Sequence, residues 1–181
     1  MNHITSSKTT IINIFGGPGA GKSTAATYIF SHLRMKGVSC EYVPEFAKEL
    51  SRAGDMEAIE NQFYISAVQY QRQFRLLGKV DYIVTDSPVL SGLVYDMQKL
   101  KGFNDVLTDI QSKSKSINIF LRRDLSREYE TEGRHHCEDD ARLFDEMIEQ
   151  LLIDQGVHYV ALGAFGMDDL LEYIMDVLGV K

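Results

Sequence analysis

The segment formed by residues 16–24 constrains the fold of this chain more than any other. It reads Gly-Gly-Pro-Gly-Ala-Gly-Lys-Ser-Thr and fits the phosphate-binding loop G-x-x-x-x-G-K-[ST]. An apolar run over 10–15 precedes it, and a segment with a helical pattern over 24–36 follows it. This is the strand–loop–helix context that such a loop requires. The alternative, a glycine-rich turn that only caps a helix, leaves that context unexplained.

The residue types in this loop suit a triphosphate. Glycines let the backbone turn its N–H groups inward, where they and the helix N-terminus hold phosphate oxygens. Lys22 adds a positive charge for the β- and γ-phosphates, and the hydroxyl of Ser23 is a natural magnesium ligand. ATP and Mg²⁺ are therefore the expected cofactors. The residues expected to bind the nucleotide are Gly16, Gly17, Pro18, Gly19, Ala20, Gly21, Lys22, Ser23 and Thr24.

Short apolar runs alternate with longer helical patterns, which is typical of a parallel sheet with helices on both faces. We expect a three-layer α/β fold of the P-loop NTPase type, with a five-stranded parallel sheet in the order 2-3-1-4-5 and a short lid over about 122–137. One domain would span residues 1–181. The expected strands cover 10–15, 39–43, 82–85, 117–121 and 158–162.

The clearest helix is expected over 56–77, with Gly78 ending it. Its apolar residues recur at helical spacing and predict one apolar face. They are Ile59, Phe63, Ala67, Tyr70, Phe74 and Leu77. A last helix is expected over 168–178.

Composition and charge exclude several classes of protein. The net charge of −7 argues against a general nucleic-acid binder, although a local basic cleft is compatible with it. Cys40 and Cys137 lie far apart and indicate no disulfide framework, which favours a reducing cytoplasm. The polar segment 1–9 lacks the apolar stretch of a signal peptide. No run approaches the roughly 18 apolar residues of a membrane span. We therefore expect a soluble intracellular protein.

A charged segment over 122–136 follows the fourth expected strand. It could form a solvated helix with i,i+4 ion pairs, or a flap whose arginines reach the phosphates when it closes. Its position favours the flap, because the ends of such strands border the ligand crevice. Adjacent His135, His136 and Cys137 cannot easily surround one tetrahedral zinc ion. Cys137 is instead expected at the start of the next helix, with Glu138 and Asp139 in its first turn.

Missing motifs narrow the activity. The chain lacks the N-K-x-D motif with which a GTPase reads guanine, and 90–93 matches only the start of a transporter signature. A ring ATPase normally adds a helical lid domain, for which 181 residues leave little room. A small kinase with a phosphate loop remains.

Four further segments strengthen this interpretation. They are Glu41-Tyr42-Val43-Pro44-Glu45, the helix start at 61–64, the segment 81–88 that ends Thr85-Asp86-Ser87-Pro88, and Gly133-Arg134. With the phosphate loop, they make residues 11–159 resemble the small nucleoside and nucleotide kinases, especially phage-encoded P-loop proteins similar to nicotinamide riboside kinase. The chain has His135-His136 where these relatives have Asn-Gln.

Two carboxylates are candidates for the chemistry. Asp86 ends an apolar strand, where a buried carboxylate needs a cation or a hydrogen bond, so we expect it to bind magnesium through water. The alternative is a helix N-cap before Pro88. The resemblance implies that Glu45 accepts the proton of the attacking hydroxyl. The alternative is an exposed glutamate favoured by the helix dipole.

Arginines and polar helix residues complete the expected site. Arg134 is the leading flap residue for charge on the transferred phosphoryl group, followed by Arg127, with Arg123 as a further candidate. The resemblance implies that a glutamine on the 56–77 helix reads the acceptor, and Gln62 fits best. A plain solvent-facing stripe is the alternative. The candidates for acceptor binding are Gln62, Tyr64, Gln69 and Arg72, together with Glu45.

These observations predict a kinase that uses Mg-ATP to phosphorylate a nucleoside- or nucleotide-like acceptor. The expected catalytic residues are Lys22, Glu45, Asp86, Arg127 and Arg134, with Ser23 and Asp86 serving the metal. Three alternatives stay open: a kinase of hydroxymethylpyrimidine bases in phage DNA, an NTPase that passes phosphate to water, and a protein that binds nucleotide without turnover. The expected partner is a small acceptor, a homodimer is left open, and the expected location is the cytoplasm, or the host cytoplasm for a phage-encoded protein.

Overall fold

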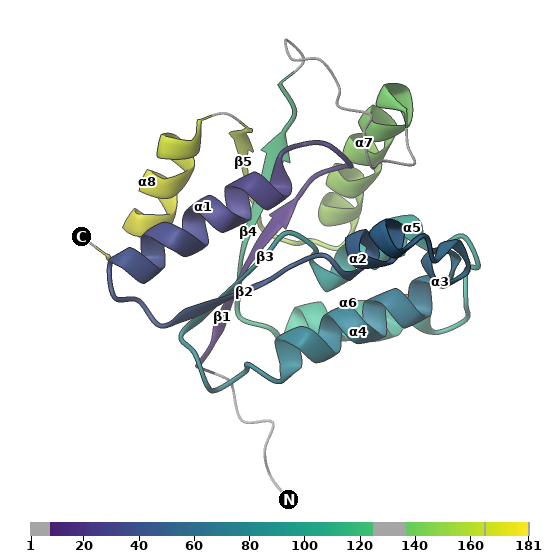
Figure 1. Ribbon diagram of the computed structural model, residues 1–181, viewed down its shortest axis with the longest axis horizontal. Helices are drawn as coiled ribbons and strands as arrows, with labels where there is room; N and C mark the ends of the chain where they lie inside the picture. The colour runs from purple at the N-terminus through teal and green to yellow at the C-terminus, as the bar shows by residue number, and fades with distance from the viewer. Residues whose placement is uncertain (1–7, 125–136, 165, 181) are drawn as a thin grey trace, which may run out of the picture.

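A parallel sheet forms the centre of the computed structural model, which describes residues 8–124, 137–164 and 166–180 (Figure 1). Its five strands run in the order β2-β3-β1-β4-β5. This order and the parallel arrangement confirm the predicted α/β fold of the P-loop NTPase type. The strands are β1 (Thr10–Phe15), β2 (Cys40–Val43), β3 (Tyr82–Thr85), β4 (Ser116–Arg122) and β5 (Val160–Gly163).

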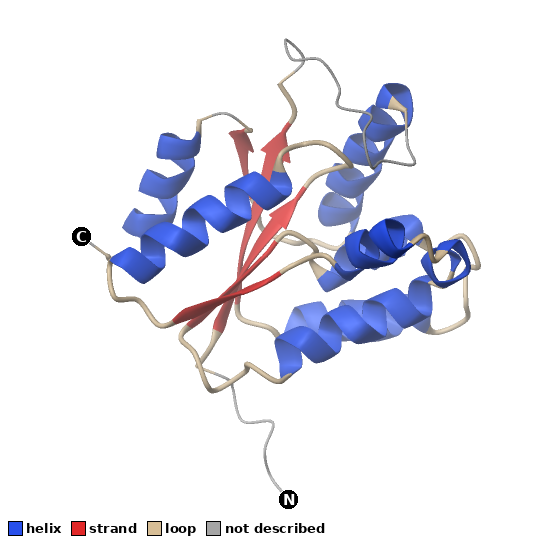
Figure 2. Cartoon of the chain, viewed as in Figure 1, coloured by secondary structure: helices blue, strands red, loops and turns tan. Residues whose placement is uncertain are grey.

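Helices cover both faces of this sheet, as predicted. Helices α1 and α8 pack on one face, and α4 to α7 lie on the other (Figures 1 and 2). A short 3-10 helix, η1 (Val89–Ser91), precedes α5. The α-helices of the described residues are α1 (Lys22–Met35), α2 (Phe46–Ala53), α3 (Met56–Glu60), α4 (Gln62–Phe74), α5 (Gly92–Tyr95), α6 (Phe103–Lys113), α7 (Glu138–Asp154) and α8 (Met167–Leu178).

The alternating side chains of β1 explain why both faces are covered. Ile12 and Ile14 are buried in the cluster that α1 and α8 form with the sheet. Phe15 points the other way and packs with Ile148 and Leu152 of α7. Such strands, buried on both faces, are typical of parallel sheets whose crossover helices lie on both sides. The loop after Phe15 therefore leaves the sheet at its carboxyl edge, between α1 and α7.

The prediction of one helix over 56–77 is wrong in two respects. Asn61 interrupts it, because its side chain accepts a hydrogen bond from the backbone N–H of Tyr64 and so begins α4 as an N-cap. Helix α4 also ends at Phe74, before Gly78.

The face that α4 buries is not the predicted apolar one. Phe63 and Phe74 are each 53% exposed. The buried face is largely polar and consists of Gln62, Ile65, Ser66, Gln69 and Gln73. Several of these side-chain amides form hydrogen bonds or contacts with the backbone around β2 and with α5, as described below. These tertiary contacts decide which face of α4 is buried, in place of the apolar periodicity.

The start of α7 confirms the prediction for Cys137. This residue is the N-cap, and it forms a reciprocal capping box with Asp140. The first turn contains three acidic residues, which interact favourably with the positive end of the helix dipole. They are Glu138, Asp139 and Asp140. Most of the expected lid, residues 125–136, lies outside the described residues. Within the described ranges, no helix combines the length and apolar character needed to cross a bilayer.

Candidate functional site

The phosphate loop connects β1 to α1 at the carboxyl edge of the sheet. Gly19 and Gly21 have φ values of 77° and 89°, which side chains with a Cβ rarely adopt. Gly21 is the N-cap of α1 and provides no side-chain cap, and the first turn carries no acidic residue. The N–H groups at this helix end are therefore not neutralised by the helix itself, which suits a phosphate group.

Lys22 lies at the centre of a group of charges. Its ammonium donates a hydrogen bond of 2.8 Å to the carbonyl oxygen of Gly17. Burial is the main cause of a lowered pKa for Lys22, and the nearby ammonium of Lys48 acts in the same direction. The carboxylates of Glu45 and Asp86 oppose that shift. The loops that follow β1, β2 and β3 thus bring their charged residues together at one edge of the sheet.

Asp86 is almost completely buried just after β3, with 1% of its surface exposed. Its Oδ2 accepts a hydrogen bond of 2.9 Å from the hydroxyl of Tyr42. Burial and the neighbouring carboxylate of Asp86 both raise the pKa of Tyr42, so this hydroxyl stays a donor. The other oxygen, Oδ1, has no hydrogen-bond partner among the described residues. An unpartnered buried oxygen is where an ion or a water is expected.

The structure does not show Asp86 as a helix cap, the alternative considered from the sequence. The next helical turn is η1, and its N-cap is Pro88 without a side-chain hydrogen bond. The oxygen of a carboxylate and the hydroxyl of Ser23 are donors that Mg²⁺ prefers. The residues present therefore fit a magnesium ion.

Glu45 is the N-cap of α2, directly after β2. It is half-buried and makes no capping hydrogen bond to its own helix. Its carboxylate is the largest charge effect that favours the protonated form of Lys22, so it lies near the ammonium of that lysine. A carboxylate in this place can accept a proton from a group bound beside the phosphates.

Lys48 is a residue of this site that the sequence analysis missed. Its ammonium donates a hydrogen bond of 2.5 Å to the hydroxyl of Ser23. The signal was present in the sequence, since Lys48 lies three residues after Glu45 and therefore on the same face of α2. A single lysine on a short amphipathic helix is otherwise read as a solvated residue.

Asp145 of α7 was also missed. Its Oδ1 accepts a hydrogen bond of 2.5 Å from the backbone N–H of Gly17, and its Oδ2 accepts one of 2.8 Å from Arg123. Arg123 also donates to the carbonyl oxygen of Pro18 at 2.6 Å. Several acidic residues lie along α7, and nothing in the pattern distinguishes this one.

Of the three arginines expected in the flap, the structure describes one. Arg123, the further candidate of the sequence analysis, lies against the phosphate loop through its contact with Pro18. The two preferred candidates of the sequence analysis, Arg127 and Arg134, lie outside the described residues, as do His135 and His136. In the parts of the chain that are described, no three His, Cys, Asp or Glu side chains are grouped closely enough to hold a metal.

The residues expected to bind the acceptor make contacts within the protein. Gln69 accepts a hydrogen bond from the N–H of Phe46 and donates to the carbonyl oxygen of Pro44, at 3.1 and 3.3 Å. Arg72 forms a bidentate ion pair with Glu49 and lies over the ring of Phe46. Both residues thus hold the start of α2.

The other two candidates differ from each other. The ring of Tyr64 is partly exposed and packs edge-on against Phe46, with ring centroids 5.4 Å apart. Gln62 is buried, and its amide donates to the hydroxyl of Ser66 at 3.1 Å. A Cβ at Gly92 would lie 3.1 Å from that amide, so Gln62 is packed against α5.

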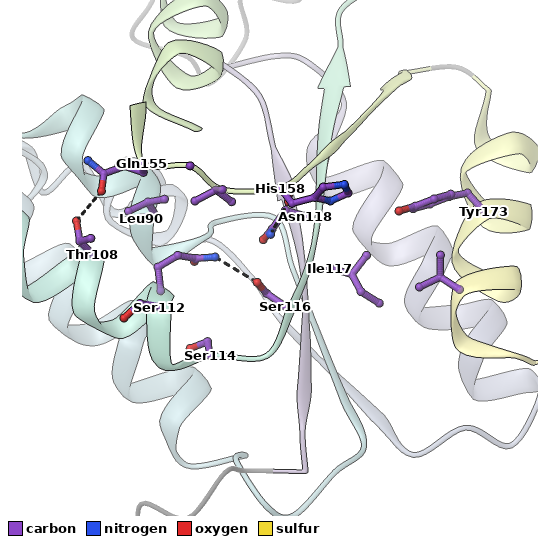
Figure 3. A pocket seen from close by; sticks show the side chains of 14 residues that line it. Leu90, Thr108, Ser112, Ser114, Ser116, Ile117, Asn118, Gln155, His158 and Tyr173 are labelled. Carbon is purple, nitrogen blue, oxygen red and sulfur yellow. Dashed lines mark hydrogen bonds between the residues drawn. The ribbon is translucent and has the colours of Figure 1, made fainter. Parts of the chain in front are cut away.

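A cavity of about 600 Å³ lies elsewhere, at the amino ends of β4 and β5 (Figure 3). Ser116 lines it and pairs with Ile11 near the start of β1, so the cavity is at the opposite edge of the sheet from the phosphate loop. Its hydroxyl and amide groups are largely hydrogen-bonded within the chain, as Thr108 is to Gln155 and Ser116 to Gln111. We assign no function to it.

Comparison with known proteins agrees with the fold described above. The family model described as an AAA domain matches residues 11–167. The solved crystal structure of NadR protein in complex with NR has a similar fold, with a TM-score of 0.69 and 14% sequence identity. The likeness covers 96% of this chain and 52% of the NadR chain, so this chain spans about half the length of that one. No curated protein matches the sequence. At this identity the structural likeness shows the fold alone.

Proposed function

Since this chain belongs to the AAA domain family, we propose that it is a magnesium-dependent kinase that transfers the γ-phosphoryl group of ATP to a nucleoside- or nucleotide-like acceptor. The observation that carries the proposal is the charge arrangement around Lys22. A phosphate loop alone would serve any nucleotide-binding protein. Two carboxylates on neighbouring strand ends, Asp86 and Glu45, add what a phosphoryl transfer to a bound acceptor requires.

The donor side follows from the loop. The N–H groups around Gly21 and the ammonium of Lys22 would hold the β- and γ-phosphates. Ser23 and, through water, Asp86 would hold Mg²⁺. The ion would neutralise charge on the phosphate oxygens.

Glu45 has the place and the chemistry of a proton acceptor. The acceptor oxygen would bond to the γ-phosphorus while the bond from that phosphorus to the bridging oxygen breaks. The hydroxyl proton would pass to the carboxylate of Glu45, and ADP would leave with the electron pair of the broken bond. Phosphoryl transfer needs a positioned base more than a strong one. A base favours a hydroxyl acceptor over an acceptor that attacks through an ionised phosphate.

The acceptor would lie beside α2, where Glu45 and the partly exposed ring of Tyr64 offer a proton acceptor and an aromatic face. Gln69 and Arg72 would act by fixing α2, and Gln62 would read the acceptor only if its contact with Ser66 opened. The fold of NadR, solved with NR bound, supports a small ligand in such a fold. Arg127 and Arg134 remain our candidates for the arginines that stabilise the transferred charge.

The decisive experiment is a screen for acceptor-dependent transfer. Purified protein would be incubated with ATP labelled at the γ-phosphate, Mg²⁺, and a panel of nucleosides and nucleoside monophosphates. Labelled product that disappears in the Glu45→Gln variant supports the proposal. Release of label only as inorganic phosphate would replace it with an NTPase. Labelling only of DNA that contains hydroxymethylpyrimidines would replace it with a DNA base kinase.

A further inference from the structure

Lys48 holds the hydroxyl that the proposed magnesium ion needs. Its ammonium lies 2.5 Å from Ser23 Oγ, and its side chain is otherwise exposed. No carboxylate forms an ion pair with it among the described residues. A surface lysine gains little from a neutral hydroxyl, so this position needs an explanation beyond stability.

The backbone that carries Lys48 is fixed relative to the phosphate loop. Gln69 bonds the N–H of Phe46 and the carbonyl oxygen of Pro44 at the start of α2. One turn later, Glu49 is clamped by the bidentate contact with Arg72. Only the flexible stem of Lys48 is left to move, and its Cα keeps its place beside the site.

An ammonium and a divalent cation cannot share the oxygen of Ser23, because like charges repel strongly at contact distance. When a metal–nucleotide complex binds, the ammonium must leave this oxygen. The terminal phosphate, a strong anion, would then lie beside the loop residues Lys22 and Ser23 that hold it. Lys22 already serves the loop through its bond to Gly17.

We propose that Lys48 is a catalytic residue that contacts the γ-phosphoryl group of bound ATP and that Ser23 holds its ammonium until the nucleotide binds. The inference rests on the proposed function, because it assumes that a triphosphate binds this loop. A charge-assisted contact to the γ-phosphate would strengthen as negative charge spreads over the transferred group. A contact of this kind distinguishes ATP from ADP.

Nucleotide affinity tests the proposal without relying on turnover. Calorimetric titrations would compare Mg-ADP with the Mg complex of a non-cleavable ATP analogue that has an imido group between the β- and γ-phosphorus atoms. In Lys48→Met we expect the analogue to bind about tenfold or more weakly, while ADP changes less than about twofold. Lys48→Arg should keep most of the wild-type affinity for the analogue. Arg52→Met, which removes another exposed cation one turn further along the same helix, is the matched control and should change neither.

The outcomes separate this proposal from the proposed function. An equal loss for both nucleotides, or no loss for either, overturns the role of Lys48 even if the wild-type protein phosphorylates an acceptor. A selective loss for the analogue supports Lys48 even if every acceptor in the screen fails. If Lys48→Met does not fold, Lys48→Gln gives the same comparison. Wild-type protein that binds neither nucleotide overturns both.

Discussion

The carboxylate of Asp145 accepts a hydrogen bond from the backbone N–H of Gly17, across 128 positions of sequence. One N–H group of the phosphate loop is thus bonded to a carboxylate of the protein itself. The same carboxylate pairs with Arg123, which lies at the start of the segment 122–137 expected to form the lid. Loop, lid base and α7 are joined at one point, so a change at any of them should affect the others.

The close approach of α7 to Gly17 predicts a specific steric sensitivity. A Cβ at Gly17 would lie 2.6 Å from the carbonyl oxygen of Ala141 and 2.7 Å from Asp145. We expect Gly17→Ala to lower the free energy of unfolding by about 1–3 kcal/mol, because backbone would have to shift. Gly163→Ala is the control, since its Cβ meets no atom within 4 Å. Urea denaturation would measure both, and equal stability of the two variants would contradict the prediction.

The pair of Arg123 and Asp145 should contribute cooperatively. Their side chains are 9% and 17% exposed and 2.8 Å apart. Removing either partner leaves a largely buried charge, so each single alanine variant should lose about 3 kcal/mol of stability. The double variant should lose less than the sum, by about 1–3 kcal/mol. A double-mutant cycle in urea measures this coupling, and additive losses would show that the two residues act independently.

The unpartnered oxygen of Asp86 predicts a change in metal dependence. Asp86→Asn keeps an oxygen for the hydroxyl of Tyr42 but removes the charge. We expect the Mg²⁺ concentration for half-maximal activity to rise about tenfold or more, with stability changed by less than about 1 kcal/mol.

The matched control for Asp86 is Asp96. This carboxylate is also buried, and it caps the backbone N–H groups of Gln98, Lys99 and Leu100. Asp96→Asn should lose about 1 kcal/mol of stability and leave the Mg²⁺ dependence unchanged. The same metal dependence in both variants would argue against a magnesium role for Asp86.

Lys22 should be required for transfer but not for folding. Its ammonium bonds one backbone carbonyl, on Gly17, and lies among groups that would face the phosphates. We expect Lys22→Ala to lower kcat/KM by at least about 10³-fold, as loss of a charge at the transferred group does. Its far-UV circular dichroism should match the wild type. Unchanged turnover would refute the assignment.

Cys40 predicts a loss of stability at alkaline pH. Burial raises the pKa of this thiol to about 11, above the 9.0 of an exposed cysteine. Because the unfolded chain loses this proton first, the contribution is complete below pH 9 and is lost as pH rises through about 11. The pKa of Tyr42 is also raised, so its titration lowers stability in the same pH range. A comparison of two variants that both keep Tyr42 cancels this effect.

The comparison is therefore between wild type and Cys40→Ala. Their difference in the free energy of unfolding should narrow by about 2 kcal/mol between pH 8 and pH 11. Urea titrations in a reducing buffer would measure it. A constant difference would mean that the thiol titrates alike in both states.

The sequence was sufficient for the sheet and for the position of the phosphate loop between β1 and α1. Apolar runs of strand length predict β1 and β3 with the bounds that the structure has, because strands buried on both faces must be apolar throughout. The loop 16–24 could be predicted because phosphate binding requires glycines at fixed spacing. The burial of Asp86 follows from its place at the end of such a strand.

The side chains that contact the phosphate loop and the buried face of α4 could not be predicted, because tertiary contacts decide them. Asn61 interrupts the helical pattern through one side-chain hydrogen bond. Lys48 and Asp145 look like solvated charges until α2 and α7 are placed beside the loop. Gln69 is buried by its bonds to the backbone of a segment 25 positions away, which no local pattern indicates.

The amide-lined inner face of α4 should reverse the usual mutational tolerance of a helix. On its outer face, the exposed Phe74 could be exchanged for serine or lysine with little effect on folding and with better solubility. On its inner face, a hydrophobic exchange such as Gln69→Leu would leave the N–H of Phe46 and the carbonyl oxygen of Pro44 unsatisfied. Selecting variants of α4 by hydrophobicity alone would therefore retain destabilised inner-face variants and discard stable outer-face ones.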